Sequence, residues 1–495
     1  MSVKSDVNFE VLQPVSRSAV GSEQGAEGLS FDEIELPPDD APLSRRRATR
    51  KLNDRLGGIL VAIVLLAPIP LGSNRPIFWM GWAVVLGLLT AGYLIAMRRI
   101  QPTRPLQARH FKLILAVGLA LPAAALIQLL PLGSPPIGDL PAEMQPQRLT
   151  LSTMATFTGI LRLLSYGLFF FLMLEIATHP GRINAMARAI FIGIIVHATW
   201  GLAALTLLGD IAFWGKKEAY LGVATGTFVN RNSYATFLGM GMVIGIAVVM
   251  NQARHGVARP RRRMIRFDEN SLIGLAGWLG IAVIATALMA TQSRMGIAAS
   301  LAGCMVVYYA MSVKIRGAPW ETFIRVMLLA VILTAILLAA FGQGAIERSL
   351  FLSEAIDTRA DLYAQVAGMI AERPFFGYGL DTFPIAYEIF HDAPVSSGVI
   401  WPHAHNTYLA LWVEMGVVAG SLPMLALLIA TMRLVRSVRR RASAFAMPVA
   451  ALGILALGSL HSLVDFGLEI QANVFLFLAI LALGLGQLRR KADER

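Results

Sequence analysis

The sequence predicts an all-α polytopic membrane protein with about twelve transmembrane helices and one large, partly helical outer loop. Of its 495 residues, 56% are hydrophobic and only 15% are charged, and the mean hydropathy is +0.62. Apolar runs recur along the chain, each close to the roughly 20 residues that cross a bilayer core of about 30 Å. One long polar segment, residues 342–406, interrupts them. This composition excludes a soluble domain of the same length.

Taken in order, the predicted spans cover residues 57–73, 77–96, 111–131, 158–177, 187–208, 230–250, 271–291, 295–312, 323–341, 407–431, 446–465 and 470–488. The chain is therefore divided into an N-terminal tail (1–56), a first group of spans (57–341), the outer loop (342–406), a last group of spans (407–488) and a C-terminus (489–495). Because its first part is acidic and rich in proline, the tail is predicted to be a disordered cytoplasmic segment without a cleavable signal peptide.

The distribution of basic residues sets the predicted orientation. Most of the 43 Lys and Arg residues fall in alternate connections between spans, as the positive-inside rule requires. Both termini are therefore expected in the cytoplasm, and residues 342–406 on the outer face. The net charge of +12 follows from this pattern, so no nucleic-acid partner is expected. Cys304, within an apolar run, is expected to be a buried small side chain.

Three arginines on the predicted outer face, Arg231, Arg294 and Arg359, are exceptions to that rule. Arginine at a membrane boundary is costly unless it reaches the headgroups, pairs with an acid or binds an anion. An anion site and a plain structural role are equally supported by the residues alone. For Arg359 the competing interpretation is a surface salt bridge with a neighbouring aspartate.

Apolar periodicity predicts an amphipathic helix over residues 358–372, ended by Pro374. Arg359 would lie in its first turn, where free backbone N–H groups and the guanidinium can share one phosphate. A second short helix over about 382–391 follows the glycine-rich segment GYGLDTF. Its aromatic face either rests on the membrane, covers a cleft or simply packs inward.

The segment WPHAHNTYL carries two histidines where the loop meets the next span. His405 is the candidate general base, since imidazole exchanges protons near neutral pH. His403, two residues earlier, would join it in a metal site only with Asp381 or Asp392. Because the acidic residues show no ligand pattern, no metal is expected. His391 is expected to be structural.

His461, Asp465 and Glu469 recur at a spacing of four residues near the outer end of a predicted span. They would share one face of a helix that continues past Gly467. Ionisable residues at membrane depth suggest function, and the partner expected for Asp465 is His461 or an outer arginine. A buried ion pair that only fixes helix packing is an equally supported alternative.

Five stretches together resemble the O-antigen ligase superfamily, which includes O-antigen and exopolysaccharide polymerases and O-linked oligosaccharyltransferases. They are GTFVNRNSYATFL (226–238), TQSRMG (291–296), TRADLYAQVAGMIAERPFFGYGLDTF (358–383), HAHNTYLALWVEMGVVAG (403–420) and HSLVDFGLEIQAN (461–473). The resemblance does not reach the N-terminal tail.

The resemblance implies a multi-pass enzyme of the bacterial inner membrane that transfers glycan from an undecaprenyl diphosphate carrier, on the periplasmic face and without a metal or other cofactor. Its partners would be that donor, a glycan or lipid A-core acceptor, membrane lipids and other polysaccharide assembly proteins. The two arginines and one histidine regarded as essential in the family fall on Arg294, Arg359 and His405. The wider predicted substrate-binding set is Arg231, Asn230, Asn232, Lys216, Lys217, His403, Asn406 and Asp465.

The chemistry implied is direct displacement at the anomeric carbon, which inverts its configuration. The paired N–H donors of arginine guanidinium groups can stabilise the negative charge that grows on a leaving diphosphate. A general base must accept the proton of the acceptor hydroxyl. The motifs do not separate a polymerase from a ligase, although the N-terminal tail and basic loops, as docking elements, favour a polymerase. The alternative from another class is a twelve-span transporter, against which stand the absence of a repeat between the halves and the outer position of the polar residues.

Overall fold

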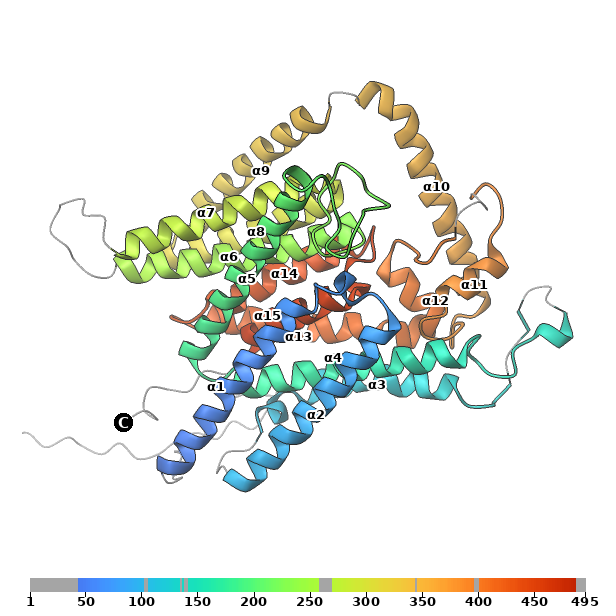
Figure 1. Cartoon of the computed structure of the whole chain (residues 1–495), viewed down its shortest axis with the longest axis horizontal. Helices are drawn as coiled ribbons and strands as arrows, with labels where there is room; N and C mark the ends of the chain where they lie inside the picture. The colour runs from blue at the N-terminus through green and yellow to red at the C-terminus, as the bar shows by residue number, and fades with distance from the viewer. Residues whose placement is uncertain are drawn as a thin grey trace, which may run out of the picture. The chain divides into compact units, whose positions relative to one another are not determined.

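The computed structural model of the chain describes residues 43–101, 106–133, 136–137, 141–257, 269–342, 345–395 and 400–486. Within these ranges the regular structure is helical, which confirms the predicted all-α membrane fold (Figure 1). The first 42 residues of the predicted tail and the predicted C-terminus (489–495) lie outside the described residues.

The helices are α1 (Leu43–Leu66), α2 (Pro76–Ile100), α3 (Lys112–Gln128), α4 (Thr153–Ile176), α5 (Pro180–Thr206), α6 (Arg231–Val257), α7 (Glu269–Ala290), α8 (Arg294–Arg316), α9 (Pro319–Gly342), α10 (Ala345–Glu372), α11 (Phe383–Phe390), α12 (Thr407–Gly420), α13 (Leu422–Arg440), α14 (Ala446–His461) and α15 (Gln471–Leu485). The helix α1 therefore begins inside the region predicted as tail. A short 3₁₀ turn, Gly467–Glu469, lies between α14 and α15.

Each predicted span corresponds to a helix or to a bent pair of helices, but the number twelve is not confirmed. Among the described residues, seven helices are long and apolar enough to cross a membrane, or eight if α12 and α13 count as one span. The first half of α1 carries Arg and Lys residues, and α14 and α15 have only 16 and 15 residues.

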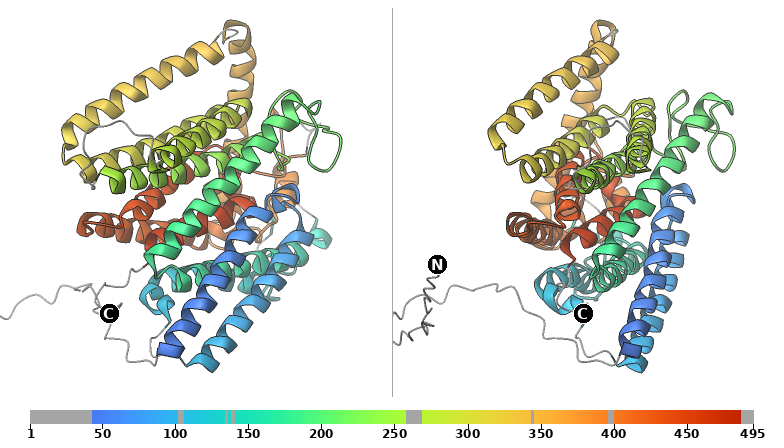
Figure 2. Two further views of the ribbon diagram at one scale, coloured as in Figure 1. Left: turned by 60° about the vertical axis from the view of Figure 1, so that its left-hand side comes forward. Right: turned by 90° about the vertical axis from the view of Figure 1, so that its left-hand side faces the viewer.

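The centre of the bundle is α6, which packs against α8 and α14, and these two helices also contact each other. In the most apolar 18-residue stretch of α6, 83% is buried inside the structure, whereas the corresponding share in α2 is 17%. A Cβ added to Gly239 would lie 2.0 Å from the Ser300 side chain, and one on Gly303 would lie 2.7 Å from the Gly453 carbonyl oxygen. Glycines at these crossings let the helix backbones approach closely, as in many membrane bundles. Figure 2 shows the three helices in contact from two directions.

The contacts between helices give their directions. Residues near the start of α6 meet residues near the start of α8, because a Cβ on Gly296 would lie 2.6 Å from the Ala235 side chain. The C-terminus of α14 meets the start of α6, where His461 Nδ1 lies 2.7 Å from Thr236 Oγ1. The helices α6 and α8 are therefore parallel, and α14 runs against them. We call the end of the bundle where α6 and α8 begin the site end.

The connections predicted to share one membrane face do meet at the site end. The Trp214 indole donates to the Ile69 carbonyl (2.7 Å), and the amide of Ala224 donates to the Ala290 carbonyl (2.8 Å). The amide of Thr407 likewise donates to the Ser462 carbonyl (3.0 Å). Alternating loops must fall on one side of a bundle of spanning helices, so these contacts follow from the hydropathy pattern.

The predicted outer loop is more helical than the sequence suggests. The predicted helix 358–372 is the last part of the 28-residue α10, and the predicted short helix 382–391 is α11. The first is confirmed at its C-terminal end, and the second is confirmed to within one residue at each end. The aromatic face of α11 packs inward, with Phe383 and Tyr387 buried, which selects the plain packing interpretation.

Span ten is not the continuous helix that the sequence predicts. Within α12, Gly416 adopts φ 73° and ψ 166°, and α12 and α13 are bent by 68°. The glycine-rich segment fills the break, because the amides of Tyr378 and Gly379 donate to the carbonyls of Val413 and Glu414 (2.9 and 3.0 Å). Figure 1 shows α10, α11 and α12 grouped together beside α3 and α4.

Candidate functional site

A cavity lined by three of the predicted residues, Asn230, His403 and His405, lies at the site end and has a volume of about 330 Å³. Its walls come from the α1–α2 connection, the segment before α6, the residues before α12 and the α14–α15 connection. It is lined by Leu71, Asn74, Tyr220, Phe228, Val229, Asn230, Ser233, Ile400, Trp401, Pro402, His403, His405, Phe466 and Ile470. The lining therefore includes aromatic rings, two imidazoles and two amide side chains, which suits a ligand that has both polar groups and an apolar ring face.

His405 lies directly before Asn406, the residue that caps the start of α12. Its φ of 51° lies in the left-handed region, which a residue with a side chain adopts at a cost. Its carbonyl accepts a hydrogen bond from the Tyr363 hydroxyl of α10 (2.9 Å), and burial raises the pKa of that hydroxyl, which therefore stays protonated. The His405 side chain is 25% exposed, and its Nδ1 lies 3.6 Å from Asp465 Oδ1.

His403 is held by a second carboxylate. Its Nδ1 lies 3.0 Å from Glu469 Oε2, and its ring stacks on Phe466 with the ring centroids 3.8 Å apart. The edge of the His405 ring approaches the same phenylalanine, at 5.2 Å between centroids. Two carboxylate–imidazole pairs therefore flank one aromatic ring in the cavity wall.

Asp465 lies between two histidines. Its Oδ2 is 3.8 Å from His461 Nε2, so the predicted partner is confirmed, and His405 is a partner that the sequence did not reveal. Burial would raise the pKa of this carboxyl, but the His405 and His461 imidazoles and the Phe466 amide hold it below its usual range. The ionised carboxylate can therefore stabilise a positive charge on His405.

The prediction that His461, Asp465 and Glu469 share one helical face is wrong. Helix α14 ends at His461, and the chain turns through the 3₁₀ segment before α15 begins. Gly467 sits so close to α6 that a Cβ there would lie 2.4 Å from Thr236 Oγ1. The turn directs Asp465 toward His405 and Glu469 toward His403, which a straight helix would not do.

Arg231 and Arg294 are the first residues of α6 and α8. Asn230 caps α6 by accepting from the amides of Asn232 (2.7 Å) and Ser233 (3.4 Å), and Ser293 caps α8 by accepting from Gly296 (3.3 Å). Since the two helices are parallel, both positive helix ends and both guanidinium groups belong to the site end. Helix N-termini bind anions through free N–H groups and the helix dipole.

Arg231 is near the cavity, because its guanidinium lies 5.8 Å from the ring of Tyr220, which lines it. Arg294 is exposed and is not among the lining residues. The cavity and the predicted arginines are therefore neighbours rather than one closed site.

Arg359 does not lie in a helix start. Helix α10 begins at Ala345, so Arg359 is in its interior, where backbone N–H groups are used within the helix. The predicted sharing of one phosphate between the helix start and the guanidinium is wrong. Arg359 lies one turn before Tyr363, which contacts His405, and its side chain is partly exposed.

The remaining predicted residues have local roles in the structure. Lys217 is buried, pairs with Asp210 (2.8 Å) and donates to the Val223 carbonyl (2.5 Å), whereas Lys216 is exposed. Burial would raise the pKa of Asp210, but Lys217 and the Gly222 amide hold it below its usual value. The pair therefore fixes the loop before α6.

Asn406 is the N-cap of α12. Its side-chain oxygen accepts from the amides of Tyr408 (3.0 Å) and Leu409 (3.1 Å), and its amide group donates to the Leu463 carbonyl (2.9 Å). Asn406 thus orients His405 by fixing the next residue. Asn232, in the first turn of α6, is partly exposed.

Several residues of the site had no separate signal in the sequence. Tyr220, Phe228, Trp401 and Phe466 line the cavity, and Tyr363 holds the backbone of His405. Isolated aromatic residues in a hydrophobic chain are mostly core residues, so the sequence alone did not single them out.

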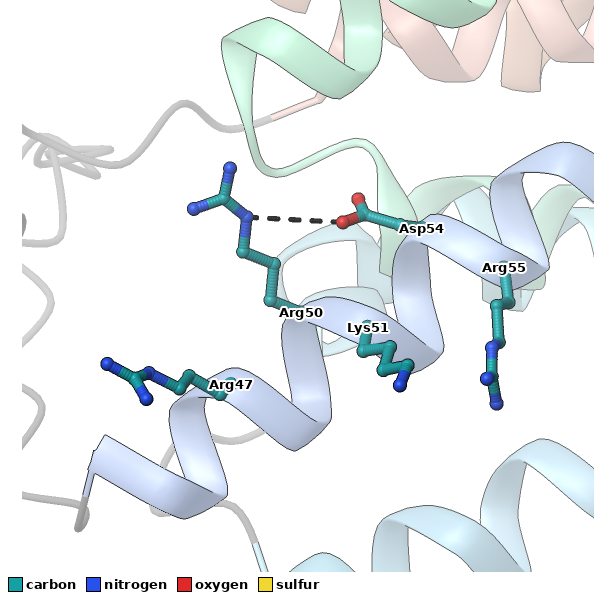
Figure 3. Close-up of a pocket in the computed structure, with 5 residues that line it drawn as sticks. All are labelled: Arg47, Arg50, Lys51, Asp54 and Arg55. Atoms are coloured by element: carbon teal, nitrogen blue, oxygen red, sulfur yellow. Dashed lines mark ion pairs between the residues drawn. The ribbon is translucent and has the colours of Figure 1, made fainter.

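A second hollow, of about 440 Å³, lies on α1 and is lined by Arg47, Arg50, Lys51, Asp54 and Arg55 (Figure 3). Arg50 and Asp54 form a long ion pair (3.9 Å), and Asp54 also pairs with Arg182 of α5 (2.7 Å). These side chains are charged and largely solvated, as expected for the basic end of a membrane helix.

Comparison with protein families gives a match over part of the chain. Residues 279–424 match a family described as O-Antigen ligase, a region that includes α8 to α12 and carries Arg294, Arg359, His403 and His405. The match covers under a third of the chain, and Arg231 and Asp465 lie outside it. No curated protein matches the chain. The match nevertheless confirms the resemblance predicted from the sequence: the chain is a multi-helix membrane protein similar to O-antigen ligases.

Proposed function

We propose that this protein is a metal-independent membrane glycosyltransferase. It transfers or polymerises an oligosaccharide carried on undecaprenyl diphosphate, at the periplasmic face of a bacterial inner membrane. The observation that carries the proposal is the meeting, at one end of the bundle, of two arginine-bearing helix starts with a cavity that contains two imidazoles and several aromatic rings.

The leaving diphosphate is received by the helix starts. As the bond between the anomeric carbon and the diphosphate oxygen breaks, negative charge grows on the leaving group. Arg294 and Arg231 offer forked donors, the N-termini of α6 and α8 add fixed dipoles, and Arg359 reaches in from α10. The polyprenyl chain of the donor stays among the apolar helices, while the sugar of the donor enters the cavity.

The acceptor hydroxyl is activated by His405. Its oxygen forms the new bond to the anomeric carbon from the side opposite the diphosphate, so the configuration is inverted. The hydroxyl proton passes to the His405 imidazole, and the Asp465 carboxylate stabilises the imidazolium that results. Because Asp465 remains ionised at neutral pH, this support is present under ordinary conditions.

The proposal is tested by deleting the gene and analysing surface and lipid-linked glycans. Single repeat units that accumulate on the lipid carrier identify a polymerase, and full-length chains stranded on the carrier identify a ligase. Purified protein in lipid discs, given a polyprenyl diphosphate glycan and an acceptor, should release polyprenyl diphosphate. An unchanged glycan profile together with no release in vitro contradicts the proposal.

One observation favours the second candidate, a transporter. The helices α12 and α13 form a broken span with the buried Glu414 at the break, and broken helices are a feature of transporters. Vesicles that contain the protein and accumulate or flip a glycolipid, without cleaving it, would support transport. Conversion of the donor without transport supports the enzyme.

A further inference from the structure

We infer that His403 contacts the acceptor sugar and that Glu469 is its positioning residue. In this arrangement the Nδ1–H of His403 is held by the Glu469 carboxylate, and Nε2 accepts a hydrogen bond from an acceptor hydroxyl and orients the sugar for attack. The inference rests on the proposed function and adds a residue that recognises the acceptor, beside the His405 that receives the proton.

The first support is the fixed geometry of the His403 ring. The contact between Nδ1 and Glu469 Oε2 (3.0 Å) requires the hydrogen on Nδ1 when the imidazole is neutral. The ring planes of His403 and Phe466 differ by only 11°, so stacking prevents the imidazole from turning away. One tautomer and one orientation are therefore selected before any ligand binds.

The second support is the free nitrogen. His403 lines the cavity, and its side chain is 23% exposed. The part of the chain that the structure describes supplies no hydrogen-bond partner for Nε2. With the proton fixed on Nδ1, Nε2 is an acceptor, which matches the donor that a sugar hydroxyl presents.

The third support is the set of side chains that line the cavity together with His403. The side chains of Asn74 and Asn230 and the rings of Tyr220 and Trp401 line the same space. Amide groups hydrogen-bond hydroxyls, and aromatic faces cover the apolar face of a sugar ring. The polar side chains of this wall therefore offer a glycan acceptor hydrogen-bond partners that a lipid tail would leave unused.

The fourth support is that packing alone does not explain why position 403 is a histidine paired with Glu469. A phenylalanine at position 403 would stack on Phe466 equally well, whereas a histidine brings a carboxylate that must be desolvated. Glu469 Oε1 is itself buried, with no hydrogen-bond partner among the described residues. A cost of this kind is typical of a group kept for ligand binding.

The test measures steady-state transfer by the purified full-length protein in lipid discs, with saturating polyprenyl diphosphate glycan and varied acceptor. His403→Ala should raise the KM for the acceptor about tenfold or more while kcat falls less, because one orienting hydrogen bond is lost. Glu469→Ala should behave in the same way. Glu469→Gln, whose amide oxygen still accepts from Nδ1–H, should stay within about threefold of the wild type.

Matched controls are His391→Ala and Glu388→Ala. They remove an imidazole and a carboxylate that do not line the cavity, so the KM for the acceptor should not change. If His403→Ala does not accumulate in the membrane, His403→Phe keeps the stacking and removes both nitrogens. An unchanged acceptor KM in either His403 variant overturns the inference, as does a Glu469→Gln variant as impaired as Glu469→Ala. A wild-type protein that transfers no glycan overturns the proposed function instead, so the two failures are distinguishable.

Discussion

At the scale of single residues, the site depends on where each imidazole is anchored. His405 has an uncommon backbone conformation that Tyr363 and the Asn406 cap hold in place. Strain of this kind persists only when several contacts over-determine it, and it concentrates at functional positions. The backbone of His403 does not have this uncommon conformation, but its imidazole lies closer to its carboxylate, at 3.0 Å from Glu469 against 3.6 Å between His405 and Asp465. The two histidines therefore suit different tasks, proton transfer and substrate orientation.

Replacing His405 by alanine tests the first task. His405→Ala should lower kcat by about 10²-fold or more, because a positioned general base contributes about 10²–10⁴. The protein level and membrane insertion should not change, since the side chain is partly exposed. Release of polyprenyl diphosphate by purified protein measures the effect, with His391→Ala as the control. Full activity of His405→Ala would remove it from the mechanism.

Replacing Arg359 by lysine tests whether a forked donor is needed. Arg359→Lys keeps the charge but loses the planar guanidinium, so transfer should fall by about tenfold or more. The exposed Arg188→Lys on α5 is the matched control. Equal donor KM and kcat in wild type and Arg359→Lys would indicate that only charge neutralisation matters at this position.

At the scale of elements, the break in α12 organises the approach to the site. Gly416 has a positive φ, and a Cβ there would lie 2.3 Å from the Phe375 carbonyl oxygen. The break opens the carbonyls of Val413 and Glu414, which accept hydrogen bonds from the glycine-rich segment. Gln128 of α3 donates to the same Glu414 carbonyl and to that of Phe376. The N-terminal half of α12, with Asn406 at its start, is thereby fixed against α3.

A substitution at the break should destabilise the fold. Gly416→Ala places a side chain in a left-handed conformation and against a backbone oxygen, at a cost of about 2 kcal/mol or more in the free energy of unfolding. Gly87→Ala in α2, where a Cβ meets nothing within 4 Å, should be neutral or slightly stabilising. Thermal unfolding of both variants in detergent measures the difference. Equal midpoints would mean that the break relaxes freely.

At the scale of the whole bundle, the site exists because three helices bring their ends together. The crossing of α6, α8 and α14 relies on glycine contacts, one of which joins two backbones: a Cβ on Gly303 would lie 2.7 Å from the Gly453 carbonyl oxygen. The crossing places the starts of α6 and α8 beside the end of α14. Arg231 and Arg294 then share one end of the bundle with the cavity.

A substitution that separates α8 from α14 should lower glycan transfer, although the substituted residue lies outside the cavity. Gly303→Leu forces α8 away from α14, so both folding stability and transfer should fall, although no residue of the cavity changes. Gly87→Leu, on an open surface of α2, is the control and should insert and transfer normally. Activity assays and detergent stability are measured on both. A fully active and stable Gly303→Leu would show that the glycine contact is dispensable.

Several features follow from the sequence by local physics. Apolar runs separated by basic loops predict spanning helices whose alternate connections share a face, and these connections meet in the structure. The last part of α10 and the position of α11 follow from apolar periodicity and from Pro374. The motifs around Arg294, Arg359 and His405 predicted the resemblance that the family match confirms.

Only the tertiary structure decided which groups meet. His403 and Glu469 are 66 residues apart, and the turn at Gly467 gives each histidine its own carboxylate where the sequence predicted one shared helical face. The break at Gly416 and the early start of α10 were also hidden, since apolar periodicity continues across both. Periodicity reports which side of an element is buried, whereas pairing of polar side chains depends on contacts between elements. For that reason the sequence determined the kind of membrane protein and its chemical groups, and the packing of the bundle determined how they are combined.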